Sequence, residues 1–221
     1  MELAWTAWAA ILGFVVAAIF AGRLRLPRNL FLLVYVPITA GFFIAFVLLS
    51  EVDVPAALKH HWGWGLLGAG VAGAAMVKNV RSQPPSPRST GAGLLVDILW
   101  PGLAYGLVDA LLLSVLPVLV VKSALVGAGW PSGWMAHVGF GGAALLASLV
   151  VTAAYHLGYP EFRGKPVSGA MLGNGILTVA YLLTQNPLAP LLSHAAMHVA
   201  AILHGRETTV QLPPHYPQED G

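Results

Sequence analysis

The chain has 221 residues, of which 57% are hydrophobic and only 9% are charged, with a formal net charge of +2. Soluble domains carry about 25% charged residues, so this chain lacks the polar groups to cover a surface in water, and we expect lipid to be its solvent. It has no cysteine, which excludes disulfides and cysteine-ligated metals, and no basic stripe with interleaved aromatic residues, so no nucleic-acid partner is expected.

Seven apolar runs follow one another along the chain, and each predicts a transmembrane helix. They lie at about residues 3–21, 29–50, 62–78, 92–121, 134–158, 167–185 and 187–205. The first run lacks the positive start of a secretory signal and is long for one, so we interpret it as a retained helix. The sequence therefore predicts an all-α fold, a polytopic transmembrane helical bundle of about seven helices in contact with the lipid bilayer.

Basic residues divide unevenly between the two sides of this predicted bundle. With the N-terminus outside, only Lys59 and Lys122 lie outside and nine basic residues face the cytoplasm, as the positive-inside rule requires. We therefore predict a multi-pass protein of the plasma membrane, oriented N-out and C-in. The nine are Arg23, Arg25, Arg28, Lys78, Arg81, Arg88, Arg163, Lys165 and Arg206.

Proline residues suggest how the chain is divided. Pro101 interrupts the long fourth run, and proline disfavours a helical conformation in the residue before it. We expect a short interfacial or re-entrant stretch at 92–100, with Asp97 near the headgroups, and the true helix from about Pro101. We interpret the Pro/Ser-rich segment at 82–91 as a linker. The predicted parts are a three-helix membrane part at 1–81, a cytoplasmic linker at 82–91, a four-helix core at 92–205 and a flexible cytoplasmic tail at 206–221.

Asp109 lies in an apolar stretch well inside the predicted fourth helix. An unpaired carboxylate at this depth costs at least a few kcal/mol, and no Lys or Arg lies in the other spans to neutralise it. Its candidate partners are histidines, a metal ion, Tyr105, Ser114 or a proton of its own.

Three histidines are placed where they could reach this carboxylate. His194 and His198 are four residues apart on the last predicted helix, so they share a face, and this spacing can ligate one metal ion. His156 lies near the cytoplasmic end of the fifth. At about 1.5 Å of rise per residue, all three and Asp109 fall in the cytoplasmic half of the bilayer. A single intramembrane histidine can also be only an interhelical hydrogen-bond donor.

Three stretches, in this order, carry a resemblance to a known family. Residues 101–113 read PGLAYGLVDALLL, residues 152–156 read TAAYH and residues 186–198 read NPLAPLLSHAAMH. They are similar to the EExxxR, FxxxH and HxxxN or HxxxD motifs of the CPBP family, the CAAX-protease and bacteriocin-processing (Abi) intramembrane metalloproteases. The resemblance covers about residues 97–205 and includes Gly173 in the intervening helix.

In this family a glutamate and histidines form an intramembrane site that activates water for peptide cleavage, with a metal ion in some members. By position, His156 and His194 match the family histidines, His198 takes the Asn or Asp place and Asp109 matches the second glutamate. The resemblance thus implies Asp109, His156 and His194 as catalytic residues, and His156, His194, His198 and Asp109 as ligands of a divalent metal such as zinc.

The chain departs from the family pattern at three positions. Val108 stands in place of the first, catalytic glutamate, Leu113 replaces the arginine and Thr152 replaces the phenylalanine. Val108 cannot accept a proton from water, and Asp109 would have to be re-aimed by about 100° around the helix to do so. If four protein ligands fill the site, the metal is structural, because a catalytic zinc keeps one position open.

These departures favour a degenerate, non-proteolytic member of the family that acts as a membrane scaffold or as a subunit binding a membrane protein or peptide partner. The alternative is an active intramembrane metal-dependent endopeptidase that uses Asp109 and the three histidines, so enzymatic activity is left open.

Three further interpretations rest on weaker patterns. A b-haem or electron-transfer protein would place His156 opposite His198 as axial ligands. Ser168, in the segment 167–173, resembles the serine of rhomboid-type proteases. Intramembrane ionisable residues also line ion paths, but the small size and the absence of repeats argue against a secondary transporter.

Overall fold

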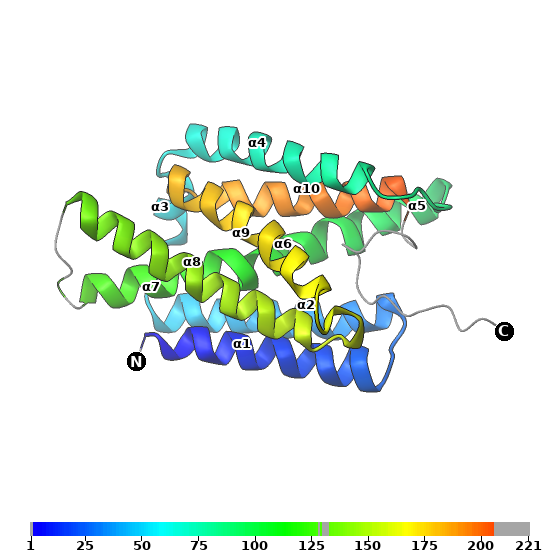
Figure 1. The fold of residues 1–221 in the computed structure, drawn as a ribbon, viewed down its shortest axis with the longest axis horizontal. Coiled ribbons are helices and arrows are strands. Elements are labelled where there is room, and N and C mark those ends of the chain that lie inside the picture. Colours follow the sequence, from blue (N-terminus) through cyan, green and yellow to red (C-terminus); the bar gives the residue numbers. More distant parts are fainter. Residues whose placement is uncertain (1, 128, 130–132, 206–221) are drawn as a thin grey trace.

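A computed structural model describes residues 2–127, 129 and 133–205 of the chain; Arg206 and the predicted tail at 206–221 lie outside the described residues. The described residues form helices joined by turns and short loops, and no β-strand occurs among them (Figure 1). The predicted all-α class is therefore confirmed.

Each of the seven apolar runs contains a helix. Beside them lie the short helix α3 (Val54–Lys59) and the 3-10 turn Pro160–Phe162. The long elements are α1 (Ala4–Val16) continued by the π-helical η1 (Ala17–Arg23), α2 (Arg28–Leu49), α4 (Trp62–Arg81), a composite central helix, α8 (Trp134–Leu157), α9 (Pro166–Thr184) and α10 (Leu188–His204).

Five of these helices are long and apolar enough to cross a membrane, which indicates a membrane protein. They are Ala4–Arg23, Arg28–Leu49, Gly91–Leu125, Trp134–Leu157 and Pro166–Thr184. α10 is apolar but has only 17 residues, and α4 is rich in glycine and ends with Lys78 and Arg81. Seven spans and the N-out orientation therefore stay predictions.

The connections that follow α1, α4 and α8 lie at the end of the bundle opposite to the N-terminus (Figure 1). These connections and the helix ends beside them carry eight of the nine basic residues expected to face the cytoplasm, all except Arg206, which lies outside the described residues. The fold thus gathers those residues at one end, as a positive-inside arrangement requires. Which side of the membrane this end faces stays a prediction.

The central helix consists of α5 (Gly91–Asp97), η2 (Ile98–Ala104), α6 (Tyr105–Ala110), η3 (Leu111–Val115) and α7 (Leu116–Gly127). It continues through Pro101, so the predicted break before this residue is wrong. Because η2 is π-helical, its hydrogen bonds skip one residue more than in an α-helix, which accommodates the missing N–H of proline. Asp97 is buried and accepts a hydrogen bond from Ser89 Oγ at 2.6 Å, and its depth relative to the headgroups stays a prediction.

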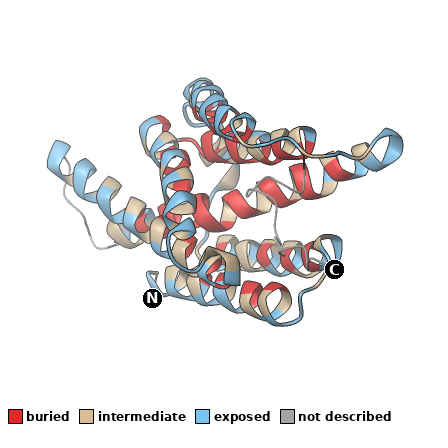
Figure 2. Ribbon diagram, turned by 45° about the vertical axis from the view of Figure 1, so that its right-hand side comes forward, coloured by how far each residue is buried: buried red, intermediate tan, exposed pale blue. Residues whose placement is uncertain are grey.

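Burial distinguishes the central helix from the helices around it. In its most apolar window 78% of the residues are buried, against 22–28% in the other four membrane-length helices. Figure 2 shows the same contrast, with buried positions along the central helix and exposed positions on the outer ones. The outer helices expose large apolar side chains, which suits contact with lipid.

Small residues allow the helices around the future site to approach closely. α10 packs against both α4 and the central helix. A Cβ atom on Gly106 of α6 would lie 2.9 Å from Ala195 Cα, so these two backbones are nearly in contact. Such small-residue interfaces are typical of helices packed within membranes. Because α4 lies along α10, helices from both sides of the 82–91 segment pack into one bundle.

Candidate metal site

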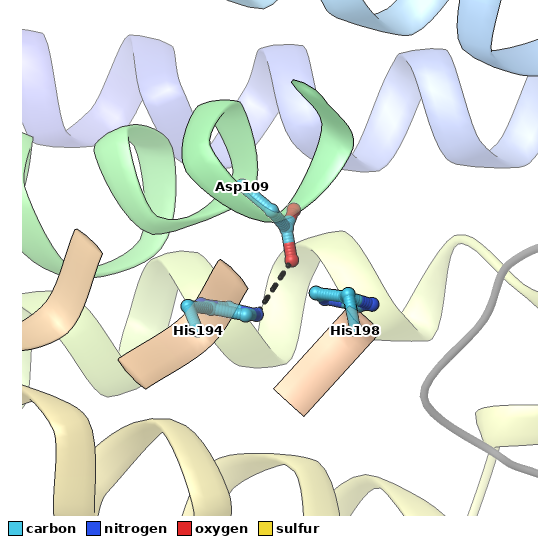
Figure 3. A group of neighbouring side chains, drawn as sticks. All are labelled: Asp109, His194 and His198. Carbon is cyan, nitrogen blue, oxygen red and sulfur yellow. Dashed lines mark ion pairs between the residues drawn. The ribbon is translucent and has the colours of Figure 1, made fainter. Parts of the chain in front are cut away.

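The central helix and α10 bring Asp109, His194 and His198 together (Figure 3). Each offers one ligand atom, and these atoms all lie within 4.8 Å of one another. All three side chains are buried, at 4% exposure or less. We call these residues the acid–histidine cluster. Three of the four predicted metal ligands therefore lie close enough to bind one metal ion.

Both oxygens of Asp109 are engaged. Oδ2 lies 3.3 Å from His194 Nε2, the contact drawn in Figure 3. Oδ1 accepts a hydrogen bond of 2.6 Å from the hydroxyl of Tyr35 on α2. A buried carboxylate needs such partners, because an unpaired charge in an apolar interior is expensive.

The two histidine rings lie one above the other on α10. Their centroids are 4.9 Å apart and their planes differ by 11°, while Tyr105 contacts His198 edge-on at 4.7 Å. His194 Nδ1 is buried and has no hydrogen-bond partner among the residues that the structure describes. Because buried polar atoms are nearly always paired, this nitrogen marks a place where a ligand or water is expected.

The donor atoms of the cluster are compatible with a divalent metal ion. Zinc binds imidazole nitrogen and carboxylate oxygen at about 2.0–2.2 Å in a tetrahedral site, which places neighbouring donor atoms about 3.3–3.5 Å apart. The observed 3.3 Å between His194 Nε2 and Asp109 Oδ2 matches that spacing. Two histidines with one carboxylate also form a donor set that zinc uses. Three protein ligands would leave one tetrahedral position open.

His156, the fourth expected ligand, does not belong to this group. Its Nδ1 is hydrogen-bonded to the Thr152 carbonyl at 2.8 Å, one turn earlier on α8. Its ring makes edge contacts with Tyr155 and with Phe162. The rotation of α8 explains this position. Tyr155 faces the central helix, where its hydroxyl lies 2.9 Å from that of Tyr105. His156 is the next residue, so its side chain points about 100° away around the helix.

The tyrosines around the cluster were not predicted from the sequence, apart from Tyr105 as a possible partner of Asp109. Tyr159 donates to the Tyr155 hydroxyl at 2.6 Å, and Tyr155 in turn contacts Tyr105. Tyr35 lies outside the region that resembles the CPBP family. The only available signal was a phenol inside an apolar run, which becomes informative only when a buried acceptor is known to lie opposite.

A second polar cluster lies further along the central helix, on the C-terminal side of Asp109. We call it the neutral cluster, and its members are Ser114, Ser148, Thr152, Asn174 and Thr178, all of them buried. Asn174 donates to Thr152 Oγ1 at 2.7 Å and accepts from Ser114 Oγ at 2.8 Å. Two departures from the family motifs adjoin it: Thr152 is a member, and the Leu113 carbonyl accepts from Ser148 Oγ at 2.6 Å.

The third departure, Val108, is partly buried and packs against the apolar core. The serine of the rhomboid-type alternative, Ser168, is exposed and donates to the Lys165 carbonyl at 2.7 Å near the start of α9. Neither residue is a member of the acid–histidine cluster.

No family model matches this chain, and no curated protein or solved structure matches it either. The resemblance to the CPBP family therefore rests on the three sequence stretches alone. The chemistry of the site has to be argued from its own residues.

Proposed function

We propose that this protein is a CPBP-like, multi-pass membrane protein that binds one divalent metal ion and acts without proteolysis, as a membrane scaffold or partner-binding subunit. The observation that carries the proposal is the buried group of Asp109, His194 and His198, with ligand atoms within 4.8 Å of one another.

In this proposal Asp109 and the two histidines hold the ion between the central helix and α10. Asp109 supplies the negative charge, and the histidines bind through neutral imidazole nitrogens. A bound divalent cation would compensate the buried carboxylate and cross-link the two helices where Gly106 and Ala195 are already in close approach. Such a cross-link favours a fixed helix arrangement, which is what a scaffold has to present to a partner.

The surroundings of Asp109 support the non-proteolytic interpretation. Peptide hydrolysis needs a base that takes a proton from water within hydrogen-bond reach. Val108 has no such group, and Asp109 is the only carboxylate in the cluster. Its two oxygens contact Tyr35 and His194, which favours a carboxylate that is held in place over one that takes a proton from water.

The proposal is tested by elemental analysis of the purified full chain, wild type against His194→Ala and His198→Ala. We expect about one metal ion per chain in the wild type and loss of the ion in both variants, since two ligands seldom suffice for zinc. His156→Ala is the matched control, because this histidine lies outside the group. Absence of metal from the wild type would refute the proposed site, and its loss from the control would show that His156 is a ligand after all.

A second candidate function is supported by one observation. Three protein ligands leave an open tetrahedral position, and catalytic zinc sites have this arrangement. A metal-dependent hydrolase would cleave a membrane-anchored peptide in the wild type and spare it in Asp109→Asn. That result would favour the hydrolase function over the scaffold function. No cleavage by metal-loaded wild type supports the scaffold, and equal cleavage by both forms excludes a role for Asp109 in the cleavage.

A further inference from the structure

Tyr35 joins two parts of the bundle that lie far apart in the sequence. It is 74 residues from Asp109, on a different helix, and its hydroxyl donates to Asp109 Oδ1 at 2.6 Å. The side chain is completely buried. A hydrogen bond of this length between a hydroxyl and a carboxylate belongs to the short, charge-assisted class, which is about twice as strong as a neutral pair.

The phenol ring of Tyr35 is held on several sides by other aromatic rings. Phe31, one turn earlier on α2, stacks on it at 5.6 Å with 17° between the planes. Tyr105 of the central helix and Tyr155 of α8 contact it with centroid distances of 5.5 and 5.2 Å. A ring confined in this way holds its hydroxyl in one place, and the hydroxyl in turn fixes the rotation of the Asp109 carboxylate.

The direction of this contact matters for a metal ligand. Because Oδ1 is occupied by Tyr35, Oδ2 is the oxygen that faces His194 Nε2 at 3.3 Å. The carboxylate is therefore presented to the histidines through one oxygen. In characterised metal sites, ligating carboxylates are commonly held by such hydrogen bonds, and their loss weakens metal binding.

We infer that Tyr35 is the positioning residue of the Asp109 carboxylate, and that α2 thereby completes the metal site from outside the CPBP-like region. This inference rests on the proposed metal-binding function. It assigns a role to the N-terminal helices: they supply the group that orients the one anionic ligand.

The test compares metal affinity in the full-length wild type and in Tyr35→Phe, which keeps the ring and removes the hydroxyl. Co²⁺ is titrated into the purified protein, because its visible spectrum reports both affinity and ligand geometry, and Zn²⁺ is then measured by competition. We expect binding about 10–100-fold weaker in Tyr35→Phe, with an altered Co²⁺ spectrum at saturation.

Tyr159→Phe is the matched control. It also removes a buried phenol hydroxyl from the same aromatic group, but that hydroxyl donates to Tyr155. The control should bind Co²⁺ as the wild type does, with an unchanged spectrum. A purely structural role for Tyr35 would alter thermal unfolding without altering the Co²⁺ spectrum.

The outcomes separate the inference from the proposal beneath it. Wild-type affinity and spectrum in Tyr35→Phe would overturn the inference and leave the metal site standing. A wild type that binds neither ion would overturn both. Failure of Tyr35→Phe to fold would also overturn the inference, since the hydroxyl would then be needed for the fold and not for orienting Asp109.

Discussion

Two buried polar clusters lie along the same central helix, and they differ in chemistry. Asp109 of the acid–histidine cluster and Ser114 of the neutral cluster are five residues apart, about 7.5 Å along a helix at the usual rise. One cluster contains ionisable groups and the other contains none. The members of both clusters are buried, so the clusters differ in the chemistry of their side chains and not in their burial.

The neutral cluster is closed upon itself. Ser148 and Thr178 hydroxyls lie 2.8 Å apart, and Asn174 bonds to residues of the central helix and of α8. The Leu113 carbonyl accepts two of these hydrogen bonds within the π-helical segment η3, where the backbone pattern is irregular. Such a network joins three helices and satisfies its own polar groups, so a structural role is enough to account for it.

The acid–histidine cluster is not closed in this way. It contains a carboxylate, and His194 Nδ1 has no hydrogen-bond partner among the described residues. Burial of polar groups is common to both clusters and therefore says little about function. What distinguishes a candidate site is the combination of ligand chemistry with a polar atom whose bonding is incomplete.

The largest expected effect separates the clusters by metal binding. Asp109→Ala removes the only anionic ligand, so metal affinity should fall by more than the roughly 100-fold that is typical for residues that merely orient a ligand. Asn174→Ala, in the neutral cluster, should leave the metal content at the wild-type level. Elemental analysis of both variants measures the difference. Metal loss from Asn174→Ala would contradict this prediction, because metal binding would then depend on both clusters.

An intermediate effect is expected from the close contact between α6 and α10. Gly106→Ala places a methyl group 2.9 Å from Ala195 Cα and 3.1 Å from His198 Cδ2, so the two helices must separate. Overpacking of this kind costs about 1–3 kcal/mol of unfolding free energy, and the displaced histidine should bind metal more weakly.

Gly93→Ala is the control for this substitution, on the same central helix. Its added methyl group would meet Ser89 Cβ at 3.6 Å, an ordinary contact. Unfolding in detergent and Co²⁺ titration should both be unchanged in the control. If Gly106→Ala were destabilised while binding metal normally, the contact would support the fold but not the position of His198.

Much of this arrangement was predictable from the sequence where a residue's position along a helix decides the outcome. The spacing of His194 and His198 placed them on one face, and Asp109 stood out because no Lys or Arg lies in the other spans to neutralise it. The three do lie together. The apolar runs likewise located the other six long helices, but not the start of the central one, to within a few residues.

Other features depend on rotation and packing between helices, which the sequence does not encode locally. His156 was expected in the site, but α8 directs Tyr155 inward and leaves His156 against Phe162. The true central helix was expected to begin at about Pro101, but a π-helical stretch continues the helix through this residue. Tyr35 and Asp109 are 74 residues apart in the sequence, so their contact could be recognised only once the packing of the helices was known.

The smallest expected effect tests whether the neutral cluster is only structural. Thr178→Val keeps the volume of the side chain and removes a hydroxyl that contacts Ser148 and Ser114 on two other helices. Interhelical hydrogen bonds in membranes contribute about 0.6 kcal/mol on average and up to about 1.7 kcal/mol, so the unfolding free energy should fall by about that amount. Thr184→Val on the same helix is the control, because among the described residues its hydroxyl bonds only to nearby carbonyls of its own helix and the turn after it. Both variants should retain metal. A Thr178→Val protein with normal stability but reduced metal content would mean that the neutral cluster supports the ligands of its neighbour, and the division into a structural and a functional cluster would fail.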